Sequence, residues 1–177
     1  MSVVALSELL GATVRDATGA VRGRVRELAI VPLDHPTRIA YLIVRTAIGE
    51  RVLPLDALKS AGATVRASTD AIDWEPYTAS DGLLLLKRDL LDQQIIDVHG
   101  RKVVRVNDVE LESTPVNSHL LLNVVSVDVG ARGGLDDQEG DAGWMILRRD
   151  GDFAHASPHG AGGIAHGGAE EFGQGDE

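Results

Sequence analysis

An internal repeat divides this sequence into two related halves. Residues of the first half match those 81 positions later without a gap, over about 45 positions. Glycines, acids and arginines match as well as apolar residues, so two copies of one folding unit explain the pattern better than chance similarity between valine-rich strands. The matched positions are Glu8-Leu9-Leu10 with Asp89-Leu90-Leu91, Val14 with Ile95, Asp16 with Asp97, Gly19 with Gly100, Arg24-Val25 with Arg105-Val106, Glu27-Leu28 with Asp108-Val109, and Ile43-Val44 with Val124-Val125.

Each copy of the repeat is expected to form β-strands. Short runs rich in valine, isoleucine and threonine are separated by turns that contain glycine, which is the pattern of β-hairpins. Gly19 and Gly100 fall in the first hairpin turn of each copy. The fourth strand of the second copy is weaker, because Gly133 and Gly134 stand there. The predicted strands are residues 14–16, 21–31, 39–46 and 51–55 in the first copy and residues 94–98, 103–111 and 120–129 in the second.

Two further segments of the folded part carry specific expectations. Residues 7–10 and 88–91 precede the first strand of each copy, and their Leu-Leu pairs fit either one helical turn or a strand lead-in. Between the copies, Trp74 and Tyr77 stand among turn residues. We expect these two aromatic side chains to pack between the copies rather than to bind a ligand.

Composition limits the class of protein. The chain has 177 residues, 44% of them hydrophobic, with six aromatic residues and no cysteine. A mainly aliphatic core is expected, and disulfides and thiolate metal sites are excluded. No apolar run approaches the roughly 18 residues of a membrane span, so a cytoplasmic protein is the expectation. The net charge of -10 disfavours nucleic acid and anionic membrane surfaces as partners.

The C-terminal part differs from the rest. Residues 131–177 hold 12 of the 20 glycines, and after Ala154 no apolar period remains. Such a segment buries too little to offset the entropy of fixing it, so residues 137–177 are predicted to form an acidic, glycine-rich, disordered tail. Within it, residues 144–147 form an apolar island that is expected to dock on the folded part.

The residues of the first copy resemble a known family. The segments that carry the resemblance are Leu6-Ser7-Glu8-Leu9-Leu10-Gly11, Val14-Arg15-Asp16, Gly19, Gly23-Arg24-Val25, Ile30-Val31, Tyr41 to Val44 and Val52-Leu53-Pro54-Leu55. This pattern is similar to the PRC-barrel, the small β-barrel of the photosynthetic reaction-centre H subunit. The same domain forms the C-terminal part of the ribosome maturation factor RimM.

The second copy, at residues 88–97 and 100–109, resembles the cytoplasmic PRC-like segment found ahead of MgtE-type magnesium-transporter and CBS domains in some bacterial proteins. The likeness spans roughly residues 6–135 and implies no catalytic residues. After Leu135 neither an MgtE-type helical domain nor a CBS pair follows, so transport by this chain alone is not expected. The resemblance implies a mainly β fold of two tandem PRC-like barrels, residues 1–80 and 81–136, followed by the tail.

Three groups of polar residues are candidates for binding. Arg22, Arg24 and Arg26 alternate along one predicted strand and share a face, and with Arg105 they form a possible basic stripe for RNA or an acidic partner. The tail histidines are possible ligands of a transition metal, although a solvated tail explains them more simply. Exposed turns likewise explain the four aspartates better than a magnesium site. The histidines are His155, His159 and His166, and the aspartates are Asp89, Asp92, Asp97 and Asp108.

Catalysis has little support in the sequence. Asp34 and His35 are adjacent, but no serine or cysteine motif accompanies them. We therefore expect a cofactor-free, non-catalytic adaptor or regulatory module that binds a protein partner. The alternatives are an RNA-associated assembly factor similar to RimM and a regulatory partner of a magnesium transporter. A homo-oligomer is a further open alternative.

Overall fold

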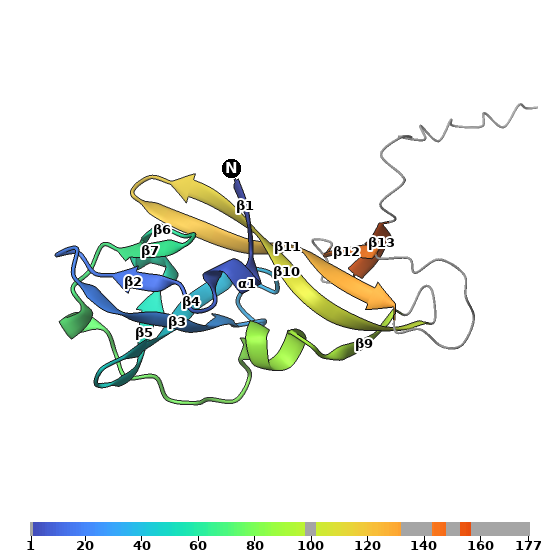
Figure 1. Ribbon diagram of the computed structural model, residues 1–177, viewed down its shortest axis with the longest axis horizontal. Helices are drawn as coiled ribbons and strands as arrows, with labels where there is room; N and C mark the ends of the chain where they lie inside the picture. The colour runs from blue at the N-terminus through green and yellow to red at the C-terminus, as the bar shows by residue number, and fades with distance from the viewer. Residues whose placement is uncertain (1, 98–101, 132–142, 148–152, 157–177) are drawn as a thin grey trace, which may run out of the picture.

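The chain is a mainly β protein with two antiparallel-rich sheets (Figure 1). The computed structural model describes residues 2–97, 102–131, 143–147 and 153–156. The strand order of neither sheet returns to its first strand, so the sheets are open where two closed barrels were expected. Gly100, His159 and His166 lie outside the described residues, as does the chain after Ala156.

The first sheet has the order β5-β4-β3-β2-β7-β6, and β8 also pairs with β3. All of its pairs are antiparallel except β2 with β7. Its strands are β2 (Thr13–Arg15), β3 (Val21–Ile30), β4 (Ile39–Thr46), β5 (Gly49–Pro54), β6 (Leu58–Ser60), β7 (Thr64–Ala67) and β8 (Leu84–Leu85).

The second sheet has the order β1-β10-β11-β12-β13, with β9 also paired to β10. Its strands are β1 (Ser2–Ala5), β9 (Gln94–Asp97), β10 (Lys102–Val116), β11 (His119–Ala131), β12 (Gly143–Leu147) and β13 (Phe153–Ala156). The island at residues 144–147 forms β12 and pairs with β11, as expected. Four short helical segments complete the fold, namely α1 (Leu6–Leu9), η1 (Leu55–Ala57), η2 (Ala71–Asp73) and the π-turn η3 (Leu86–Leu90).

The two copies of the repeat share their local backbone structure. Val25 donates its amide to the Ala12 carbonyl at 3.0 Å, and the equivalent Val106 donates to Gln93 at 3.0 Å. Gly11 has a φ of 80°, and its counterpart Asp92 has a φ of 63°. A bulge follows Val25 in β3 and the equivalent Val106 in β10. The repeat seen in the sequence is therefore a repeat of structure.

The spacing of the repeat changes at two places. Ile30 pairs with Ile39, whereas the equivalent Leu111 pairs with Val124, so the offset grows to 85 residues beyond the first long strand. The extra residues lengthen the β10–β11 hairpin. Before the helical turns the offset is 80, because η3 has one residue more than α1 and closes as a π-turn. The gap-free match therefore fails after the first long strand of each copy.

The copies exchange their first strands. β1 belongs to the first copy but pairs with β10 of the second, where Val4 lies opposite Leu111. In return, β8 precedes the second copy but pairs with β3 of the first, where Leu84 lies opposite Ile30. Because each sheet contains a strand from the other copy, the two copies interlock.

A single large cluster of buried apolar side chains joins both sheets. It includes Leu28 and Leu42 from the first copy and Leu111 and Leu122 from the second, all fully buried. Trp74 is 4% exposed and belongs to this cluster. Tyr77 packs in a smaller cluster with Ala29, Ile43 and Leu85. The expectation that both aromatic residues pack between the copies is thus confirmed.

Candidate ligand-binding groove

Two arginines face each other on the outer side of the first sheet. Arg24 of β3 lies directly opposite Arg45 of β4, and both side chains are exposed. Their neighbours Val25 and Val44 are buried, because successive residues of a strand point to opposite faces. Arg24 Nη1 donates to the Gly11 carbonyl at 2.9 Å. Like charges placed directly opposite destabilise a sheet, so this pair invites an anion from outside.

Arg26 joins this cluster from the bulge in β3. The bulge leaves Arg26 without a direct partner in β4, so its side chain is exposed while that of Glu27 is buried. Arg26 Nε lies 3.6 Å from Glu50 Oε1, a loose, half-exposed ion pair. Arg22 is also exposed but is bound elsewhere. The structure thus brings together two of the three arginines that alternate along this strand.

Two more cations come from the second copy, and sequence reasoning missed them. Lys87 and Arg88 lie in η3, with exposed side chains. The buried carboxylate of Glu27 accepts their backbone amides, from Lys87 at 2.7 Å and from Arg88 at 3.1 Å. The same carboxylate accepts the Leu28 amide at 2.9 Å. A buried acid in β3 therefore fixes the turn that carries these cations beside Arg24 and Arg26.

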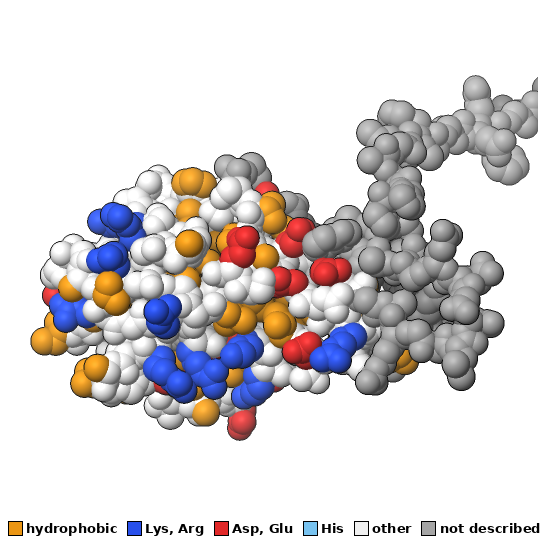
Figure 2. Space-filling model, in the orientation of Figure 1, with side chains coloured by type: hydrophobic (Ala, Val, Ile, Leu, Met, Phe, Trp, Pro, Cys, Tyr) orange, Lys and Arg blue, Asp and Glu red, His pale blue; other side chains and the backbone are white. Residues whose placement is uncertain are grey.

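These side chains line two adjoining pockets, which we call the cationic groove. Figure 2 shows Lys and Arg side chains gathered below the centre of the view, in the region of β3 and the helical turn in Figure 1. Both pockets include Arg26 and Lys87. The basic pocket, of about 340 Å³, is lined by Leu10, Gly11, Arg24, Val25, Arg26, Arg45 and Lys87. The mixed pocket, of about 350 Å³, is lined by Arg26, Glu27, Ile43, Glu50, Tyr77, Leu85, Lys87 and Arg88.

The groove combines positive charge with an apolar wall. Four cations and no acid line the basic pocket. In the mixed pocket, Ile43 and Leu85 are buried beneath the half-buried Tyr77. Arg88 grips Asp89 through two hydrogen bonds of 2.6 and 2.9 Å, which lower the pKa of the Asp89 carboxyl. Such a groove suits a ligand that carries carboxylates next to an apolar side chain.

The equivalent place in the second copy has lost this charge. There, Arg105 Nη2 lies 2.8 Å from Asp92 Oδ1, so the arginine is already paired. Arg105 lies in the second sheet, and its predicted grouping with the other arginines is not seen. The corresponding positions are Gly11 and Asp92, Arg24 and Arg105, Arg26 and Asn107, and Arg45 and Gly130.

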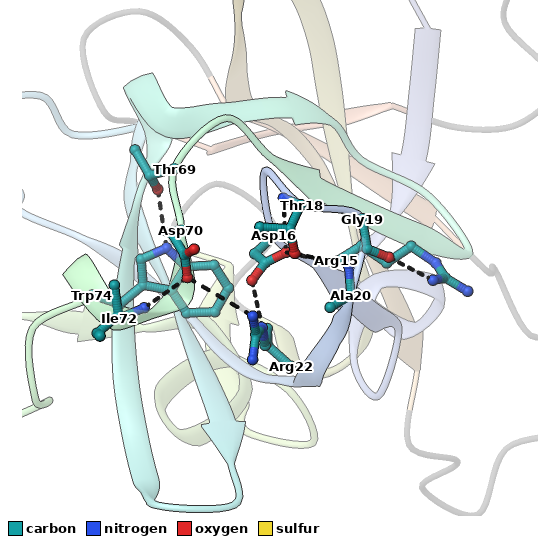
Figure 3. Close-up of polar contacts among 10 residues, drawn as sticks. All are labelled: Arg15, Asp16, Thr18, Gly19, Ala20, Arg22, Thr69, Asp70, Ile72 and Trp74. Atoms are coloured by element: carbon teal, nitrogen blue, oxygen red, sulfur yellow. Dashed lines mark hydrogen bonds and ion pairs between the residues drawn. The ribbon is translucent and has the colours of Figure 1, made fainter.

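The remaining arginine of the predicted stripe belongs to a structural network (Figure 3). Arg22 forms an ion pair with Asp16, which also accepts hydrogen bonds from the Thr18 hydroxyl and the Ala20 amide. The Thr18 hydrogen bond, followed by Arg22, holds the pKa of Asp16 at about 2, although burial opposes this. Gly19 has a φ of 83° in this turn, which confirms its predicted role.

The other candidate residues do not form a site in the described part of the chain. No group of three His, Asp or Glu side chains there is placed to hold a metal ion. Asp92 pairs with Arg105, and Asp108 accepts hydrogen bonds from Ser7. His35 Nδ1 lies near Thr37. His155 is in β13, where only the backbone is described.

Comparison with models of protein families gave no match, and neither did comparison with curated proteins. In the described residues, no helix is long and apolar enough to cross a lipid bilayer.

Proposed function

We propose that this chain is a non-catalytic binding module that holds an acidic segment of a partner protein in the cationic groove. The contrast between the two copies carries the proposal. At the same structural position, the first copy gathers Arg24, Arg45 and Lys87 without an acid in the basic pocket, whereas the second pairs Arg105 with Asp92. Since both positions belong to the same local fold, folding alone does not require the unpaired cluster.

An acidic protein segment fits the groove better than RNA does. Sequence-tolerant RNA binding uses several aromatic side chains as stacking platforms, and the groove offers one, Tyr77. A short segment interacts mainly with charges within the Debye length of about 8 Å at physiological salt. A long polyanion would also meet the rest of a chain whose net charge is -10.

We also propose that residues 6–135 form a tandem, strand-exchanged variant of the PRC-barrel fold. The repeated order of helical turn, short strand, bulged long strand and returning strand supports this assignment. In such a variant, the exchange of β1 and β8 would open each unit to its neighbour. An accessory role in a protein assembly suits this interlocked, small scaffold.

The proposal is tested by fluorescence anisotropy with two labelled probes of similar charge, octaglutamate and single-stranded octauridylate. Two double variants reverse the same number of charges. R24E/R45E alters the groove, whereas K59E/R66E alters exposed residues of β6 and β7 that do not line it. Thermal unfolding checks that both variants remain folded.

We expect octaglutamate to bind the wild type more tightly than octauridylate at 50 mM salt. R24E/R45E should weaken peptide binding about tenfold or more, and K59E/R66E should change it by less than about threefold. Equal losses in the two variants would reduce the groove to a general charge effect and contradict the proposal. Tighter binding of octauridylate would favour the RNA alternative instead.

A further inference from the structure

We propose that residues 169–177 of this chain bind the cationic groove in cis and compete there with the partner segment. This regulatory role rests on the proposed function of the groove. The occupant is identified by its charge, by the order of its side chains, and by the length of chain that connects it to the described fold.

The charge of this segment complements the groove. Glu170 and Glu171 are adjacent, Asp176 and Glu177 follow, and no lysine or arginine occurs after Arg149. The basic pocket presents four exposed cations and no carboxylate. Because Arg24 and Arg45 repel each other across the β3–β4 pair, an incoming carboxylate relieves an existing repulsion as well as forming new ion pairs.

The order of side chains also matches. Phe172 follows directly after the two glutamates. In the groove, the basic pocket adjoins a pocket with an apolar wall of Ile43, Leu85 and Tyr77, and the two share Arg26 and Lys87. An extended peptide advances about 3.3 Å per residue, so an acid and the aromatic residue next to it can enter adjoining pockets together. The phenyl ring would then pack edge-to-face or offset against Tyr77.

The connection is long enough for binding within one molecule. The last described residue of β13 is Ala156, and 14 residues lead from it to Glu170. A fully extended chain of this length spans at most about 46 to 50 Å, whereas a small domain is about 30 Å across. A tethered segment of this kind reaches effective concentrations in the millimolar range, so weak contacts are sufficient for occupancy.

Carbodiimide coupling tests this contact directly in the full chain. The reagent joins a lysine amine to a carboxylate in an amide bond only when the two groups are in contact. Lys87 lines both pockets, whereas the exposed Lys59 of β6 lines neither and serves as an internal control. After trypsin digestion, residues 150–177 remain one peptide, because no basic residue interrupts them. Mass spectrometry then reports which lysine this peptide carries.

We expect coupling of residues 150–177 to Lys87 at least about five times more often than to Lys59 at low salt, and a steep decrease at 0.5 M salt. E170Q/E171Q should remove most of the Lys87 product, and F172A should reduce it. The same E170Q/E171Q variant should bind labelled octaglutamate about threefold or more tightly than the wild type, because the competing segment no longer occupies the groove.

Three results would overturn the proposal. The first is equal coupling to Lys59 and Lys87, and the second is Lys87 coupling that E170Q/E171Q does not reduce. The third is a product that joins two chains when isotope-labelled and unlabelled protein are mixed, since the occupant would then be a second copy. Coupling to Lys87 without octaglutamate binding would instead refute the proposed partner alone.

Discussion

The Glu27 carboxylate of the first copy accepts the backbone amide of Lys87 in the second copy at 2.7 Å. The second copy returns this contact, because Asp108 Oδ1 accepts the Ser7 amide of the first copy at 3.1 Å. Each acid also accepts the amide that follows it, from Leu28 and from Val109. A buried strand acid thus ends the helical turn of the other copy in both directions, which holds the exchanged strands in place.

This contact predicts that Glu27→Gln destabilises the protein. Glu27 is 6% exposed, and its carboxylate serves three amides. The uncharged amide has one acceptor oxygen, so at least one buried N–H would lose its partner, at a cost of about 1 to 3 kcal/mol. Urea unfolding measures the effect. The exposed Glu75→Gln is the matched control, and equal midpoints for both variants would contradict the capping role.

Arg24→Gln should separate binding from stability. The substitution removes the repulsion with Arg45, so the free energy of unfolding should stay level or rise by up to about 1 kcal/mol at low salt. The gain should fade at 0.5 M salt, where charges are screened. Octaglutamate binding should weaken in the same protein. A stability loss above about 1 kcal/mol would show that Arg24 serves the fold instead.

Asp16 predicts a loss of stability in acid. Its pKa is held at about 2 in the folded protein, against an ordinary value of 3.8, so its carboxylate form stabilises the fold at any pH above the ordinary value. This contribution declines as the pH falls from about 4 through 2. Asp16→Asn should be less stable at pH 7, and its deficit should shrink over that interval. Urea midpoints at pH 7, 4 and 2.5 provide the measurement, and a constant deficit would contradict the assignment.

Gly19 predicts a local backbone cost. A valine there would be forced to a φ of 83°, although nothing lies within 4 Å of the added Cβ. The strain should cost about 1 to 3 kcal/mol, whereas Ala17→Val, at an exposed position of the same turn, should cost much less. Equal unfolding midpoints for the two variants would show that the turn does not need glycine. The matching prediction for Gly100 concerns a position outside the described residues.

Local pattern predicted the strands well because their apolar runs and glycine turns act within a few residues. The alternatives for residues 7–10 resolve to a helical turn, since Leu6 and Leu9 are both fully buried on one side of α1. Exchange of β1 and β8 depends on contacts between distant residues, and open sheets follow from it. No local pattern indicates that.

The groove shows the same division between local and distant information. Alternation along the strand correctly made Arg24 and Arg26 exposed, but it also grouped them with Arg22, which Asp16 holds. Lys87 reaches the groove only because Glu27 binds its backbone. The one available signal was the match of Glu27 with Asp108 in the repeat, which marks an acid that each copy uses in the same way.

An NMR titration of arginine Nε–Hε signals with octaglutamate tests the central claim most directly. The account predicts that the signals of Arg24, Arg26 and Arg45 shift and saturate together at low salt. Arg105, which Asp92 pairs, and Arg66, which lies outside the groove, should stay within about a tenth of that shift. Shifts of equal size at Arg105 and Arg66, or none at Arg24 and Arg45, would contradict it.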